Sequence, residues 1–316
     1  MIETHGVNSS TTESPQVQFT ELKTNGKWPE VLDLMKKDRN NDHRWVFRGL
    51  SAYDYHLTSS LDRAFADACN GTHLTIAAVQ RWKYEAWMLY QFKRRAHHYL
   101  GGSGTPRPED FLEWFSLMRH YEAPCRLVDF SSSFYIATYF AIRNARTDAA
   151  VVCVDHTWLS ERFHSLPDSG KVLQDPEVFW RHAMRHPYAV PPETIDREPF
   201  VIPVRPFRSN DRIHVQQGTF LCPTNVNKTF LENLGAMRRN GDEDEVKKHV
   251  VKIRIEKAWH PRIMHSLREM NIGSETLYPG LGGFAASLRD ILYLPDQLID
   301  DGRLSDAIKQ IPRFWE

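Results

Sequence analysis

The sequence predicts an α+β fold built from small mixed or antiparallel sheets with helical insertions. Helical periodicity dominates the first half of the chain, where Trp82, Ala86 and Leu89 recur at the spacing of helix turns. Apolar stretches of strand length, such as 149–154 and 250–255, occur separately along the chain. Because strands and helices do not alternate regularly, the pattern argues against a doubly wound parallel sheet.

Local patterns predict the elements in order. Apolar or alternating stretches predict strands at residues 43–50, 125–130, 149–154, 200–204, 212–221 and 250–255. Helical spacing predicts helices at 28–37, 74–100 and 263–270, and others that start near 108, 134 and 288. The aromatic residues Trp82, Trp87 and Tyr90 of the long helix are expected to pack in the core, with a dimer face as the alternative. The glycine-rich residues 101–104 follow a helix rather than a strand, which argues against a phosphate-binding loop.

Three further segments are set apart by composition. Residues 1–16 are rich in Ser, Thr and Glu and are expected to form a disordered leader. Residues 155–198 are rich in Pro, His and charge and are expected to form an irregular helical insertion. Residues 301–316 are expected to be a C-terminal tail. The 316 residues suffice to bury a substantial core.

Composition argues against several classes of protein. The chain has 40 Lys and Arg against 40 Asp and Glu, so it lacks the global positive charge typical of nucleic-acid binders. No apolar run is long enough to span a membrane, and no secretory signal precedes the domain. The 4 cysteines lie far apart, which favours buried free thiols in a cytoplasmic protein. His182 and His186 have helical spacing without an adjacent Glu, so no metal is expected.

An arginine at the end of the first predicted strand is the first candidate site residue. Arg48 precedes Gly49, where the backbone becomes accessible. A planar guanidinium suits bidentate binding of a phosphate or carboxylate group of a ligand. The alternative is a structural ion pair that locks two segments of the protein together.

A dense polar segment supplies the next candidates. Arg126 and Asp129 are three residues apart in a predicted strand, on opposite faces, so separate partners are expected. His120 and Tyr121 suit a general acid or base and a stacking ring, although a structural role is as compatible with the pattern. The serines that begin with Ser131 precede an apolar helix, where one of them is expected to be the N-cap and the helix N-terminus can bind an anion.

Four ordered motifs resemble the signatures of the FRG domain family, which is named for its Phe-Arg-Gly tripeptide. They are residues 47–49 with 55–63, 120–131 with 137–141, 212–220, and 276–283. The chain departs from the family pattern at Arg119, Glu122 and Cys125, where Gln, Gly and Thr are usual. The resemblance places the domain at residues 17–300, with its core motifs between 43 and 290. It also implies a relation to bacterial and phage toxins and defence proteins.

A more distant resemblance is to arginine-type ADP-ribosyltransferases, and it implies a similar core and NAD as the substrate. In such a site Arg48, beside Gly49, would hold the pyrophosphate, and Ser131 and Ser132 would orient the nicotinamide ribose. The binding set then includes Tyr121, Arg126, Asp129 and Gln216, and the catalytic set Arg48, His120, Gln217 and Glu275. Gln217 stands where those enzymes have a catalytic glutamate, so Glu275 or Glu85 is expected to supply the carboxylate.

These observations predict an NAD-binding transferase or NAD glycohydrolase that acts as a toxin or antiphage effector. One alternative is a non-catalytic nucleotide-sensing or interaction module, which the missing glutamate favours. Another is an RNA-directed enzyme that uses His120, Arg126 and the basic residues 93–95. The acceptor, whether protein or nucleic acid, and the oligomeric state stay open.

Overall fold

A computed structural model describes residues 20–23, 44–70, 80–100, 105–165, 199–207, 211–238 and 242–293. The predicted leader, the helix at 28–37, the C-terminal tail, the pair His182 and His186, and most of the insertion at 155–198 lie outside these residues. None of the helices described is long and apolar enough to cross a membrane.

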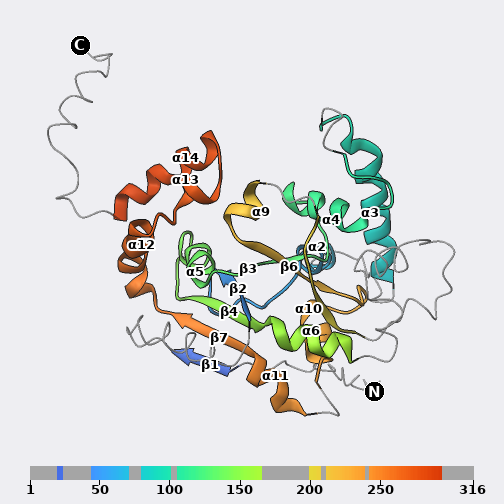
Figure 1. Cartoon of the computed structure of the whole chain (residues 1–316), viewed down its shortest axis with the longest axis horizontal. Coiled ribbons are helices and arrows are strands. Elements are labelled where there is room, and N and C mark those ends of the chain that lie inside the picture. Colours follow the sequence, from blue (N-terminus) through green and yellow to red (C-terminus); the bar gives the residue numbers. More distant parts are fainter. Residues whose placement is uncertain are drawn as a thin grey trace, which may run out of the picture.

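One sheet of seven strands forms the centre of the molecule (Figure 1). The strand order is β1-β7-β4-β2-β3-β6-β5. Neighbouring strands are antiparallel except for β1 and β7, which are parallel. The strands are β1 (Thr20–Lys23), β2 (Trp45–Leu50), β3 (Val128–Ser131), β4 (Ala149–Asp155), β5 (Val201–Val204), β6 (Gly218–Pro223) and β7 (Val250–Ile255). The predicted α+β class with mainly antiparallel pairing is confirmed, with the described strands joined in one sheet.

Helices surround this sheet in the order of the chain. They are α2 (Ser60–Cys69), α3 (Arg81–Ala96), α4 (Phe111–His120), α5 (Phe134–Ile142), α6 (His156–His164), α9 (Asp211–Val215), α10 (Phe230–Gly235), α11 (Glu243–His249), α12 (His260–Glu269), α13 (Ser274–Leu277) and α14 (Leu281–Ser287). Short 3₁₀ turns occupy η4 (Lys257–Trp259) and η5 (Leu288–Tyr293).

The strand predicted at 212–221 is wrong in its first half. Residues 211–215 form the short helix α9, and β6 begins at Gly218. The backbone N–H of Gln216 donates to the carbonyl of Arg212, as in a helical turn. Gln217 then adopts a left-handed conformation, with φ of 48°, which ends the helix and turns the chain into the strand.

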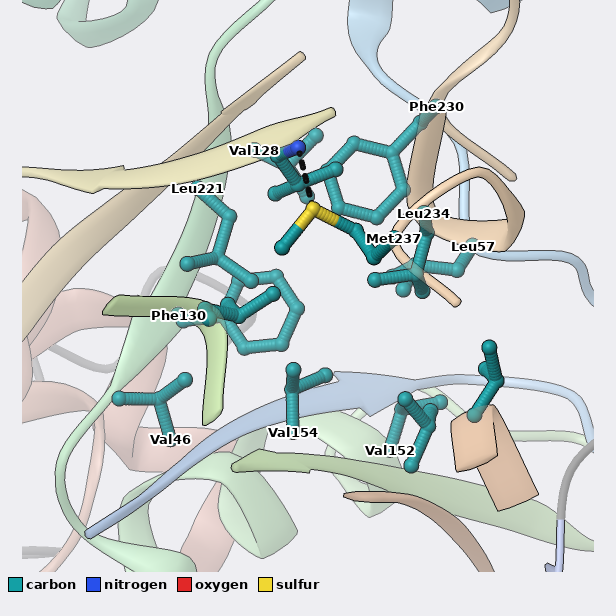
Figure 2. Close-up of a cluster of buried hydrophobic side chains, with 14 of the residues drawn as sticks. Val46, Leu57, Val128, Phe130, Val152, Val154, Leu221, Phe230, Leu234 and Met237 are labelled. Atoms are coloured by element: carbon teal, nitrogen blue, oxygen red, sulfur yellow. Dashed lines mark hydrogen bonds between the residues drawn. The ribbon is translucent and has the colours of Figure 1, made fainter. Parts of the chain in front are cut away.

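Alternation along the strands divides the apolar side chains between the two faces of the sheet. Phe47 belongs to a cluster with α5 and α12, whereas its neighbour Val46 belongs to a cluster on the opposite face. Figure 2 shows this second cluster, in which Met237 lies among strand valines and the aromatic rings of Phe130 and Phe230. The backbone N–H of Val201 donates to the Met237 sulfur at 3.3 Å.

The long helix α3 packs with α4 against β5 and β6 through Leu89 and Ala96. Its aromatic residues do not all face inward. The side chains of Trp87 and Tyr90 are 52% and 51% exposed, so the expectation that they pack in the core is wrong. Helical spacing alone cannot show which of two apolar stripes faces the sheet, because both recur every three or four residues.

Close packing between β2 and α5 depends on Gly49. A Cβ atom at this position would lie 2.2 Å from the carbonyl oxygen of Ala137 and 2.5 Å from the backbone nitrogen of Ala141. Only glycine lets the helix approach the strand so closely. The hydroxyl of Ser133 accepts from the backbone N–H of Ile136 at 3.3 Å, which confirms a serine N-cap for α5.

Candidate functional site

The candidate site lies where β2 and β3 separate. β2 pairs with β4 along its whole length, from Trp45 to Leu50, but it pairs with β3 only between Phe47 and Ser131. Beyond this point Arg48 connects the two strands through its side chain, because its Nη1 donates to the carbonyl oxygen of Asp129 at 2.6 Å. A cavity opens at this separation.

The cavity measures about 220 Å³ and collects residues from several parts of the chain. The end of α4, the packed face of α5, the α9 turn and Tyr278 form its walls around the ends of β2, β3 and β6. Its described lining residues are Phe47, Arg48, Gly49, Ser116, Arg119, His120, Glu122, Asp129, Phe130, Ser131, Ala137, Phe140, Arg212, Ile213, Gln216, Gly218, Thr219, Phe220 and Tyr278.

Asp129 is held by two arginines. Arg119 donates from Nε to Asp129 Oδ2 at 2.7 Å, and Nη2 lies 2.6 Å from the same oxygen. Arg48 Nη1 lies 3.4 Å from it. Burial would raise the pKa of Asp129, but the charges of Arg119 and Arg48 outweigh burial and hold this pKa below its usual value. The carboxylate is therefore ionised at neutral pH.

Arg48 keeps an unused donor beside the cavity. Its Nε is buried and has no hydrogen-bond partner, while its side chain is 16% exposed. Burial is the main cause that lowers the pKa of Arg48, with repulsion by Arg119 and Arg63 adding to it. A buried donor without a partner costs about 1–3 kcal/mol, so the site gains when a ligand accepts from it.

His120 and the chain around Tyr278 form the opposite wall. Burial, followed by repulsion from Arg212, lowers the pKa of His120 and favours its neutral form. The Arg212 guanidinium lies 4.8 Å from the centre of the Tyr278 ring, and the Arg143 guanidinium lies 5.0 Å from it. Gln216 Nε2 donates to the carbonyl of Leu277 at 2.9 Å, which joins this segment to the α9 turn.

The serines after β3 are tied to the turn between α9 and β6. Ser131 Oγ donates to the carbonyl of Gln216 at 2.8 Å, and the backbone N–H of Ser132 donates to the carbonyl of Gln217 at 3.0 Å. Of the predicted site residues, the cavity therefore brings together Arg48, Gly49, His120, Asp129, Ser131 and Gln216.

The other predicted site residues lie elsewhere. Tyr121 is 57% exposed, with its ring in edge contact with His120. Ser132 and Gln217 flank the cavity without lining it. Glu275 lines a second cavity of about 480 Å³ formed by α12, α13, α14 and η5. Glu275 is thus separated from the Arg48 cavity by the intervening segment.

Arg126 and Glu85 form a buried ion pair. Arg126 Nε lies 2.8 and 3.0 Å from the two carboxylate oxygens of Glu85, and Nη2 also contacts this carboxylate. The Arg126 side chain is 6% exposed and that of Glu85 is 1% exposed. Arg126 Nη1 also donates to the carbonyl of Thr224 at 3.2 Å. Neither charge is directed at the cavity, so Glu85 does not supply the expected carboxylate.

The tripeptide at the centre of this site has a separate physical role for each residue. Phe47 packs in the core, Arg48 spans the separated strands, and Gly49 admits α5. Residues 43–150 match the FRG domain. The match includes the first two motifs seen in the sequence, whereas those at 212–220 and 276–283 lie beyond it. Neither the curated proteins nor the solved structures contain a match to this chain.

Departures from the FRG pattern fall at the cavity. Glu122 has φ of 61°, a left-handed conformation that glycine, the usual residue there, adopts without strain. Its carboxylate group joins the cavity lining. Arg119 adds the cation that pairs with Asp129. Cys125 is fully buried, and burial raises the pKa of its thiol to about 12.

Several cavity residues were not selected from the sequence. Arg212, Tyr278 and Phe140 stand within the motifs but outside the residues to which a role was given. The signal that could have found Arg212 is its place beside Gln216 in the third motif. Within the described residues, no three His, Cys, Asp or Glu side chains gather as metal ligands would.

Proposed function

We propose that the cavity at Arg48 binds the anionic part of a nucleotide, with NAD as the ligand, and that it cleaves the bond between nicotinamide and ribose. The observation that carries the proposal is the buried Nε of Arg48, which has no partner and borders a cavity. The FRG match alone does not assign this activity.

Charge favours an anionic ligand. Arg48, Arg119 and Arg212 line the cavity, and two carboxylates, those of Asp129 and Glu122, oppose them among the described residues. One positive charge is thus left over. A guanidinium with a free donor suits a phosphate oxygen, because the hydrogen bond between them is assisted by charge.

The aromatic walls favour a planar ring. Phe140 and Tyr278 line the cavity and are in edge contact with each other, with ring centres 6.1 Å apart. The Tyr278 ring is fixed between two guanidinium groups. The volume of about 220 Å³ is below that of cavities which enclose a drug-sized ligand, so the cavity would take one end of a dinucleotide.

The lining residues can take part in bond cleavage. Water or another acceptor would attack the anomeric carbon of the ribose while the bond to the nicotinamide nitrogen breaks. Neutral nicotinamide leaves, and the proton of the attacking water passes to a base. His120 suits this base because its lowered pKa keeps the imidazole neutral. Asp129 and Glu122 are the carboxylates placed to stabilise positive charge on the ribose.

A non-catalytic nucleotide sensor is the second candidate. The observation in its favour is that Asp129 is already neutralised by Arg48 and Arg119, and Glu122 is exposed. Paired in this way, Asp129 stabilises a cationic transition state less than a free carboxylate would. The RNA-directed alternative loses one of its residues, since Arg126 is buried against Glu85.

The test is nicotinamide release from NAD by purified protein, with NAD binding measured in parallel by thermal shift. Arg48→Lys keeps a positive charge but removes the Nε donor, and we expect it to weaken both release and binding at least tenfold. Arg146→Gln is the matched control, because Arg146 is exposed and does not line the cavity. His120→Gln should lower release with little change in binding.

The outcomes separate the candidates. Release that depends on Arg48 supports a transferase or glycohydrolase, and the acceptor can then be sought among proteins and nucleic acids. A thermal shift without release supports the sensor. Neither release nor a shift would refute the nucleotide proposal. If release is found, toxicity on expression, lost in Arg48→Lys, is the test for a toxin or defence effector.

A further inference from the structure

We propose that the exposed face of α3 is a docking surface for single-stranded nucleic acid. The surface is a stripe of Lys83, Trp87, Tyr90 and Arg94, which recur at helical spacing and are all exposed. Helix α3 lies at the periphery of the molecule, away from α12 and α14 (Figure 1). This inference does not rest on the proposed activity at Arg48.

The stripe presents flat apolar rings to solvent. The rings of Trp87 and Tyr90 stack on each other, with centres 5.4 Å apart and planes 27° apart, yet each side chain is half exposed. Tyr84, one turn earlier, is 45% exposed. Aromatic side chains held in this way act as platforms for unpaired bases, because every base has a π face.

The charge of this face is positive although the chain as a whole is neutral. The one acidic residue of α3 is Glu85, and its carboxylate is buried against Arg126. Arg81 is likewise paired with Asp62 in the interior. Lys83, Arg94 and Arg95 stay exposed, and no carboxylate of the described residues lies within salt-bridge distance of them.

Cations at both ends of a stacked aromatic pair match a single strand better than a duplex. The phosphates of a strand follow the cations, while its unpaired bases are free to stack on the rings. In a duplex the base faces are already stacked on each other. An acidic peptide would match the cations but would have less use for two exposed aromatic faces.

The experiment is fluorescence anisotropy with labelled 12-nucleotide single strands, one of RNA and one of DNA, and with a duplex of the same length. The full chain is used, at salt concentrations from 50 to 200 mM. We expect both single strands to bind more tightly than the duplex. Three phosphate contacts predict a slope of about −2 for log K against log salt. A preference for RNA over DNA would identify the source of the strand.

Variants test each part of the stripe. Trp87→Ala and Tyr90→Ala should each weaken binding about tenfold, as expected for the loss of one stacked base. Arg94→Gln should weaken it and reduce the slope by about 0.7. Phe284→Ala, an exposed aromatic residue on α14, and Arg146→Gln are the controls, and both should bind like the wild type. Their unchanged binding would show that the loss is specific to α3.

Three results would overturn the proposal. The first is the absence of single-strand binding at 50 mM salt. The second is wild-type affinity in Trp87→Ala, and the third is a preference for the duplex. Self-association of the wild type that Trp87→Ala abolishes would show instead that a second copy of the chain covers the stripe.

Discussion

Removing Arg126 should test whether its ion pair with Glu85 has a structural role. Arg126→Met leaves the Glu85 carboxylate, 1% exposed, without its guanidinium partner. Loss of one partner from a buried ion pair costs about 3–5 kcal/mol in the free energy of unfolding. For a domain of this size, such a loss lowers Tm by roughly 10 °C.

The double variant makes the test sharper. Glu85→Leu with Arg126→Met replaces both charges by apolar side chains of similar length, which is often close to neutral. We expect it to be more stable than either single variant in urea unfolding followed by tryptophan fluorescence. If the double variant loses the sum of the two single losses, the two side chains act independently and the reasoning fails.

Three further predictions concern packing, pH and thiols. Gly49→Ala should destabilise the protein by about 2–3 kcal/mol, since its Cβ would meet the backbone of α5, whereas Gly282→Ala, with no atom within 4 Å of its Cβ, should be neutral or slightly stabilising in urea unfolding. Because the folded pKa of His120 lies below its usual value, the unfolded chain binds a proton more readily, so Tm should fall as the pH drops below about 6.5, and His120→Gln should reduce that fall. Cys69 is the one thiol that is not buried, so a thiol reagent should label it alone in the native protein at pH 8, and labelling of Cys125 without unfolding would contradict its burial.

Much of the sheet could be predicted from local sequence. The stretches at 149–154 and 250–255 are apolar enough, and short enough, that few structures other than a buried strand are open to them. The segment at 212–217 could not be assigned in this way. Its apolar residues Ile213 and Val215 are two apart, which fits a strand, but five residues are too few to exclude one turn of helix.

Prediction of the site succeeded where residues lie beside the central strands. Arg48, Asp129 and Ser131 lie on neighbouring strands, so their motifs converge once the sheet forms. Arg126 was misleading because its partner Glu85 lies 41 residues earlier on another element. Burial of a charge depends on such distant partners, which spacing within one motif does not reveal.

The narrow contact between β2 and β3 gives Arg48 two roles. Strands β1, β7, β4 and β2 form one ladder and β3, β6 and β5 another, and the ladders meet through the pair Phe47 and Ser131. Arg48 reinforces this seam by its bond to the Asp129 carbonyl. A ligand that accepts a hydrogen bond from the same guanidinium would act on a residue that holds the two halves together. Occupancy of the cavity and cohesion of the sheet would then be coupled through one side chain.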